Sequence, residues 1–180
     1  MTRLAAFAGD QRIRWQKRLP TEGRGEPAAL AALADGGLVL IGHRSISEQD
    51  TARMWVVRVD AAGEVIWERL LGPSDEEQRG RAIVLLADGG VVAAGDALRK
   101  GRRALRVVRL AADGEVVWER TFSDDERDYD VARGLARTDN GDLVLVGSTN
   151  AKGSGETHVL VMRLDGDGRL LWERVFCSAG

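Results

Sequence analysis

Short apolar runs recur along the chain, and turns rich in aspartate and glycine separate them. Residues 38–41 (LVLI) and 143–146 (LVLV) contain no polar position at all. Strands that are apolar on both sides are typical of sheets buried on both faces. The Asp-Gly-Gly and Asp-Ala-Ala-Gly segments between the runs supply residues that tolerate a positive φ, which tight hairpins need. The pattern predicts an all-β protein of short antiparallel strands.

The tryptophans reveal an internal repeat. Two sequence blocks recur in register. The first places a glycine four residues before a tryptophan. The second begins at Asp35, Asp88 or Asn140, and these residues precede their tryptophans by 32, 30 and 32 residues respectively. A period of this size is typical of repeat architectures. The four repeated tryptophans, with spacings of 52, 51 and 54 residues, are Trp15, Trp67, Trp118 and Trp172.

Each repeat is interpreted as four strands, A to D, in one antiparallel sheet. A single repeat domain, 1–180, is expected to hold a half unit at 1–20 and full units at 26–72, 80–122 and 130–176. A helix over residues 28–34 competes with the first strand A, because alanine and leucine favour helices. The equivalent stretches 81–86 and 131–136 contain β-branched residues or a glycine. Since equivalent units share one structure, we predict a strand.

The hairpin Asp-x-x-Gly-x-x-x-Trp, complete at 60–67 and 165–172, resembles the tryptophan-docking motif of quinoprotein-type β-propellers. Its pairing with the Asp-Gly-Gly block is similar to tandem propeller repeats of bacterial proteins. Ala111 and Gln11 depart from the motif. The resemblance implies WD40-like, four-stranded blades, about three and a half per chain, with the repeated tryptophans packed between neighbouring blades.

Three and a half blades are fewer than a closed ring needs, because propellers close with roughly four to eight. Two copies of the chain, a different subunit, or a distorted four-bladed ring would each resolve this. We favour a homodimer, because twofold pairing is the commonest oligomer symmetry and requires no further partner.

Composition narrows the range of functions. Twenty-six lysines and arginines against 28 aspartates and glutamates give a net charge of -2, which favours neither nucleic acid nor a membrane surface. The single cysteine, Cys177, excludes an internal disulfide, and two histidines are too few for most metal sites. No signal peptide or membrane span is evident, so we expect a cytoplasmic protein. The sequence predicts no cofactor, no metal and no catalytic residue.

The loops B–C and D–A differ between units, whereas the turns A–B and C–D are nearly uniform. Variable loops on a rigid scaffold are the usual place for binding. The sequence therefore predicts a non-enzymatic scaffold for protein interaction or assembly, acting through these loops or an open blade face. A lectin-like, carbohydrate-binding propeller and an enzyme with a site at a subunit interface are the alternatives. The candidate partner-binding residues are the charged loop residues, their neighbour Tyr129 and the unmatched Trp55, namely Arg99, Arg102, Arg103, Asp124, Asp125, Asp128, Tyr129 and Trp55.

Overall fold

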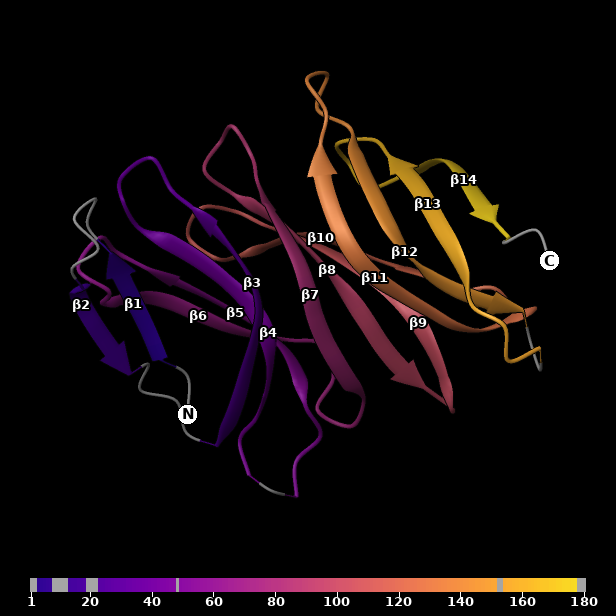
Figure 1. The fold of residues 1–180 in the computed structure, drawn as a ribbon, viewed down its shortest axis with the longest axis horizontal. Helices are drawn as coiled ribbons and strands as arrows, with labels where there is room; N and C mark the ends of the chain where they lie inside the picture. Colours follow the sequence, from indigo (N-terminus) through magenta and orange to yellow (C-terminus); the bar gives the residue numbers. More distant parts are fainter. Residues whose placement is uncertain (1–2, 8–12, 19–22, 48, 152–153, 178–180) are drawn as a thin grey trace.

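The computed structural model describes residues 3–7, 13–18, 23–47, 49–151 and 154–177. Every element in these residues is a β-strand, and the strands form consecutive antiparallel sheets arranged as an open arc (Figure 1). β1 (Arg3–Phe7) and β2 (Ile13–Arg18) form a hairpin at the N-terminal end. The prediction of β-propeller blades, about three and a half per chain, is confirmed, and the arc does not close.

Three four-stranded blades follow the hairpin, each with its strands in chain order. The first blade contains β3 (Arg24–Ala32), β4 (Leu38–Ser45), β5 (Arg53–Val59) and β6 (Val65–Leu71). The second contains β7 (Glu77–Leu85), β8 (Val91–Arg99), β9 (Arg102–Leu110) and β10 (Val116–Phe122). The third contains β11 (Arg127–Arg137), β12 (Leu143–Ala151), β13 (His158–Leu164) and β14 (Leu170–Phe176).

The alanine-rich segment that competed as a helix is a strand. β3 runs through it and pairs with β4, so that Leu30 lies opposite Leu40 and Ala31 opposite Val39. Sheet pairing supplies the backbone hydrogen bonds that a helix would otherwise make locally. Tertiary packing of the blade therefore overrides the helical propensity of alanine.

Neighbouring blades pack through a repeated tryptophan contact. The indole of Trp67 is 9% exposed, and it lies so close to Gly114 of the second blade that an added Cβ would stand 2.8 Å from the ring. Its Nε1 donates a hydrogen bond of 3.0 Å to the Ala112 carbonyl. Arg69 lies over the same ring, 5.8 Å from its centroid, and donates to Glu115 at 2.9 Å. The glycine of the hairpin motif thus leaves the space into which the tryptophan of the preceding blade packs.

The second and third blades repeat the contact between ring and glycine, but the Trp118 Nε1 has no hydrogen-bond partner among the described residues. A Cβ on Gly168 would lie 2.8 Å from the ring of Trp118, and Arg120 donates to the Asp167 carbonyl at 3.2 Å. The side chain of Trp15 lies outside the described residues. Lys17, two residues further on, forms an ion pair with Glu64, which is the counterpart of the Arg69–Glu115 pair. The N-terminal hairpin therefore contacts the first blade as a preceding blade would.

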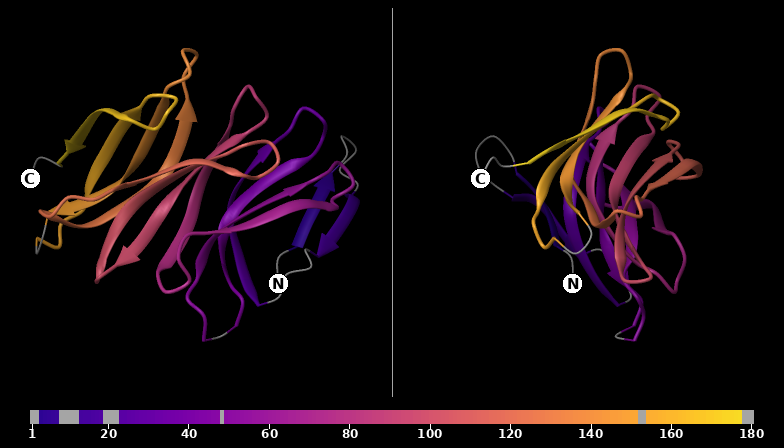
Figure 2. Two further views of the ribbon diagram at one scale, coloured as in Figure 1. Left: turned by 180° about the vertical axis from the view of Figure 1, so that it is seen from behind. Right: turned by 90° about the vertical axis from the view of Figure 1, so that its right-hand side faces the viewer.

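Among the described residues, none forms a blade against the far face of the third blade. Trp172 is 40% exposed there, and Val146, Val159 and Phe176 are also exposed. By sheet register, Val146 and Val159 correspond to Ala94 and Leu105, which are fully buried in the second blade. Figure 2 shows this end of the arc with β14 as its outermost strand. Completion of the ring by a second copy stays a prediction, which the native mass of the protein would test.

The charges repeated in each blade do not form the ion pairs that strand order suggests. Arginines on strand C and glutamates on strand D suggest cross-strand pairs, such as Arg58 with Glu68. Arg58 instead pairs with Asp35 of the A–B turn at 3.1 Å, whereas Glu68 pairs with Arg44 at 3.2 Å. The Gly37 N–H, together with Arg58, lowers the pKa of Asp35. The repeated aspartate therefore fixes its own turn and a strand C arginine at once.

We expect Trp67→Ala to lower the free energy of unfolding by about 3–5 kcal/mol, because it empties the space between two blades. Trp172→Ala is the matched control, and its cost should stay below about 1.5 kcal/mol because no blade covers that ring. Urea unfolding at low protein concentration measures both. Equal losses for the two variants would contradict this account of blade packing.

Candidate functional site

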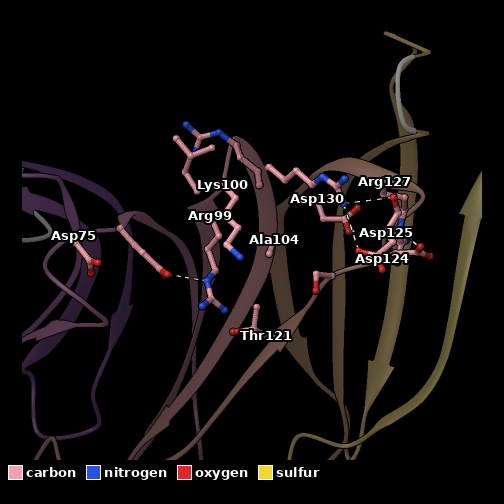
Figure 3. A pocket seen from close by; sticks show the side chains of 14 residues that line it. Asp75, Arg99, Lys100, Ala104, Thr121, Asp124, Asp125, Arg127 and Asp130 are labelled. Carbon is pink, nitrogen blue, oxygen red and sulfur yellow. Dashed lines mark hydrogen bonds and ion pairs between the residues drawn. The ribbon is translucent and has the colours of Figure 1, made fainter.

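A cleft of about 760 Å³ opens between the second and third blades. It lies on the side of the B–C and D–A loops, between the β8–β9 hairpin and the β10–β11 loop, with the β6–β7 loop at one end. Figure 3 shows Asp75, Arg99 and Lys100 towards one side and Asp124, Arg127 and Asp130 towards the other. The lining residues are mostly charged or small and polar: Asp75, Glu76, Leu98, Arg99, Lys100, Arg102, Arg103, Ala104, Thr121, Ser123, Asp124, Asp125, Arg127 and Asp130.

The β8–β9 hairpin places its basic side chains by means of a tight turn. Arg99 and Arg102 are paired in register, and only Lys100 and Gly101 connect them. Both connecting residues have a positive φ, 48° and 81°, as a two-residue turn with the right-handed strand twist requires. Glycine adopts this conformation without strain, and Lys100 is the only described residue other than glycine with a positive φ.

Ion pairs hold this side of the cleft in place. Arg103 pairs with the buried Asp96 and, at 2.8 Å, with Glu77. Arg81 also pairs with Asp96, at 2.6 Å. The hydrogen bond from Arg103 is the main cause of the lowered pKa of Glu77. Because charged groups buried in a paired network lose their freedom to rearrange, Arg103 is a fixed donor at the cleft.

The other side of the cleft contains two carboxylates that share one arginine. Arg127 Nε lies 3.5 Å from Asp124 Oδ2 and 3.5 Å from Asp130 Oδ2, and its guanidinium reaches Glu173 of β14 at 3.2 Å. Asp124 accepts a hydrogen bond of 2.9 Å from the Glu126 N–H, which closes the loop before β11. Local loop geometry and one buried arginine thus bring the two carboxylates together.

Asp130 differs from the other carboxyl groups that line the cleft in its deep burial and its raised pKa. It is 2% exposed, and its Oδ1 has no hydrogen-bond partner among the residues that the structure describes. Burial raises the pKa of Asp130, and the nearby carboxylates of Glu173 and Asp124 act in the same direction, whereas Thr149 and Arg127 oppose them. A buried carboxyl group with an ion-pair partner on only one of its oxygens is costly, so its presence at a cleft makes Asp130 a candidate for a binding or chemical function.

The corresponding position between the first and second blades is occupied differently. By register with the glycine of strand B, Asp130 corresponds to Gln78 in the second blade. Gln78 is fully buried, and its amide fills the space beside Gly72, where an added Cβ would stand 1.9 Å from Nε2. Glutamine is one methylene longer than aspartate, and at this position its amide reaches the backbone at Gly72.

The structure brings most of the sequence-predicted binding residues together. Arg99, Arg102, Arg103, Asp124 and Asp125 all line the cleft. Asp128 and Tyr129 lie beside it: Arg102 Nε is 3.4 Å from Asp128, and Tyr129 pairs with Arg103 in the single bridge between β11 and β9. Whether they bind a partner stays a prediction.

Trp55 requires a correction. Its side chain is 0% exposed, packs with Leu40 and Val57, and donates from Nε1 to Glu68 at 3.3 Å. It fills the core of the first blade and offers no surface to a partner. Sequence reasoning missed Arg127 and Asp130 as members of the site. The signal available for Asp130 was its alignment with Gln78 and Gly25, because this position differs in every blade while its neighbours on strand B repeat a glycine.

Two other kinds of site are not found in the described part of the chain. Among those residues, no three or more histidines, cysteines, aspartates or glutamates are grouped so as to hold a metal ion. The same residues include no helix with the length and apolarity needed to cross a membrane.

Comparison with known proteins supports the propeller. Residues 86–116 match a family described as a domain of unknown function (DUF5122) beta-propeller. The chain is similar to the crystal structure of an endo-arabinase from Bacteroides thetaiotaomicron VPI-5482, with 12% identity and a TM-score of 0.57, over 93% of this chain and 69% of that one. A GH32 beta-fructofuranosidase of Bombyx mori is also similar, with 9% identity and a TM-score of 0.52, over 89% of this chain and 39% of that one. No curated protein matches the chain.

These matches correct two predictions. The similar solved structures are named as enzymes that act on sugars, which contradicts the prediction of a non-enzymatic module for protein interaction and the prediction that the protein is not an enzyme. At such low identity the likeness shows the fold alone, so the chemistry of this chain has to be argued from its own cleft.

Asp130 predicts a specific pH dependence. Because its pKa is raised above the ordinary 3.8, the folded protein keeps this proton to a higher pH than the unfolded chain does. The contribution of Asp130 to the free energy of unfolding therefore falls as the pH rises from its pKa in the unfolded chain towards its pKa in the folded protein. Asp130→Asn cannot ionise, so its stability relative to the wild type should be greater at about pH 7 than at about pH 4.

Urea unfolding of both proteins at the two pH values measures this difference. Asp35, Glu77, Asp88 and Asp142 have lowered pKa values, and their opposite contributions cancel because both proteins contain them. A stability difference that is constant with pH would show that Asp130 ionises as an ordinary exposed aspartate does.

Proposed function

We propose that the chain is a carbohydrate-binding β-propeller whose binding site is the cleft between the second and third blades. The observation that carries the proposal is the polar lining of this cleft, in which carboxylates and guanidinium groups surround the buried Asp130. A sugar hydroxyl is both a donor and an acceptor, so it satisfies a carboxyl oxygen in either protonation state. The volume of about 760 Å³ lies within the range of small-molecule sites.

The rest of the lining suits a polyol better than an apolar ligand. Carboxylates and guanidinium groups form paired hydrogen bonds with fixed geometry, and ion pairs already hold Arg99, Arg102 and Arg103. Lys100 adds a flexible ammonium group at the rim. None of the lining residues is aromatic, so recognition would rest on hydrogen bonds instead of ring stacking.

The similar solved structures support the same class of ligand. One is named an endo-arabinase and the other a beta-fructofuranosidase, and both share a fold with this chain. The proposal for this chain concerns a carbohydrate in general, and arabino- and fructo-oligosaccharides are the first probes to test.

We further infer that the blades are of the tryptophan-docking, quinoprotein-like type. Two contacts support this: Trp67 packs on Gly114, and Trp118 packs on Gly168. The inference concerns the construction of the blade and not quinone chemistry.

We expect Asp130→Gln to weaken binding, because it replaces a carboxyl group in the wall of the cleft by an amide that is one methylene longer. Isothermal titration with arabino- and fructo-oligosaccharides, after a glycan array has ranked them, measures the effect. The loss should exceed about tenfold in Kd, since a buried charged hydrogen bond contributes about 1.5–3 kcal/mol.

Ser47→Ala is the control, because Ser47 lies in the β4–β5 loop of the first blade, outside the cleft. Binding should be unchanged in this variant. If no oligosaccharide binds the wild type, or if Asp130→Gln binds as well as the wild type, the cleft is not a carbohydrate site.

A further inference from the structure

We propose that the far face of the third blade is a docking surface for a blade of a different polypeptide, one whose C–D turn carries the glycine of the Asp-x-x-Gly motif. The far face is the side of the β11–β14 sheet that lies away from the second blade. Its apolar residues are Val144, Val146, Val159, Val161, Trp172 and Phe176. The cleft lies on the opposite side of this sheet, so the docking surface is independent of the proposed carbohydrate binding.

The far face repeats, position by position, the faces that form the two existing seams. In strand register, the six positions correspond in the second blade to residues of the core between the second and third blades. The same positions of the first blade belong to the core between the first and second blades. Because the repeat places the same kind of side chain at each position, the third blade is built to pack on a following blade.

Exposure is what distinguishes the far face from these packed faces. Val159 is 53% exposed, whereas its counterpart Leu105 in the second blade is fully buried. Phe176 is 53% exposed, whereas its counterpart Leu71 in the first blade is 5% exposed. A continuous apolar sheet face of this kind is typical of an interaction surface.

The two existing seams define what the partner has to present. In both, the tryptophan ring packs on a glycine of the next blade, Gly114 or Gly168, where an added Cβ would stand 2.8 Å from the ring. In both, the arginine two residues after the tryptophan donates to the carbonyl of the residue before that glycine, at 3.2 Å. Arg174 lies over the Trp172 ring, 5.9 Å from its centroid, as the corresponding arginines lie over theirs. The partner therefore presents a glycine-bearing turn, with a backbone carbonyl that accepts from Arg174, next to an apolar sheet.

A second copy of this chain has no such turn to offer. The three glycines of the motif, Gly63, Gly114 and Gly168, are all buried within the chain's own seams. At the fourth copy of the motif, the N-terminal one, Gln11 stands in place of the glycine. Two far faces set against each other would leave both tryptophans without a glycine to pack on. The occupant is therefore a blade of a different polypeptide.

The native mass of the full chain distinguishes a different polypeptide from a second copy. In light scattering at low protein concentration, we expect the wild type to have the mass of one chain. A dimer that Trp172→Glu dissociates and Leu171→Glu does not would overturn the proposal in favour of a second copy. Leu171 is the matched control because it is 52% exposed, and its counterparts Ile66 and Val117 remain exposed beside completed seams.

Docking itself is measured with a probe blade, a copy of residues 77–122, joined to Gly180 of the full chain through a linker with a protease site. Before cleavage, Trp172→Ala should lower the urea midpoint of the extended chain as much as Trp67→Ala does, because both rings are then covered. Without the probe, the loss from Trp172→Ala should be much smaller. After cleavage, the probe is a separate polypeptide, and we expect it to remain bound to the chain in size-exclusion chromatography.

Two variants keep this test specific. Gly114→Asn in the probe alone fills the space that the Trp172 ring needs, and asparagine tolerates the positive φ of 85° at this position. Trp172→Ala in the full chain removes the ring and leaves the probe unchanged. With either variant, the cleaved probe should elute apart from the chain. If the unaltered probe also elutes apart, or if neither variant weakens its binding, the far face is not a blade-docking surface.

Discussion

The contact between a tryptophan of one blade and a glycine of the next determines how the whole chain packs. Trp67 can lie against the second blade only because Gly114 has no side chain, and its indole N–H is satisfied by a backbone carbonyl of the same turn. The arginine two residues later closes the contact from the solvent side. Because the motif sets both the distance and the rotation between blades, a repeat of about fifty residues is sufficient to build the arc.

Such a repeated contact leaves the rims of the blades free to differ. The apolar middle of each seam is nearly the same, with valine, leucine and alanine from both sheets. Differences arise where strand A enters the blade: glutamine at 78, aspartate at 130 and glycine at 25 occupy one equivalent position. The side chain at this position therefore differs from seam to seam, while the tryptophan contact keeps the blades in place.

The sequence predicts the strands, the blades and the tryptophan contacts, because periodicity and turn residues are local and repeated three times. It also places five charged loop residues on one side of the sheets, and these line a single cleft. Two kinds of detail were not predictable. Arg58 pairs with Asp35 instead of Glu68 because the register sets Arg58 opposite Trp67, whereas Glu68 lies opposite Val57 and faces the other side of the sheet. The burial of Trp55 and of Asp130 depends on the neighbouring strands and blades that cover them, which no local pattern records.

The charged groups around the cleft differ in how completely they are paired. Nearly every charged group around it is paired: Asp96 with two arginines, Glu76 with Arg99, Asp125 with Arg102. Asp130 alone combines deep burial at the cleft with a carboxyl oxygen that no described residue satisfies. Gln78, at the equivalent position of the preceding seam, is also fully buried, and neither polar atom of its amide has a hydrogen-bond partner among the described residues. Asp130 differs from Gln78 in that it can ionise: burial opposes its ionisation, and a polar ligand that filled the cleft would change that balance.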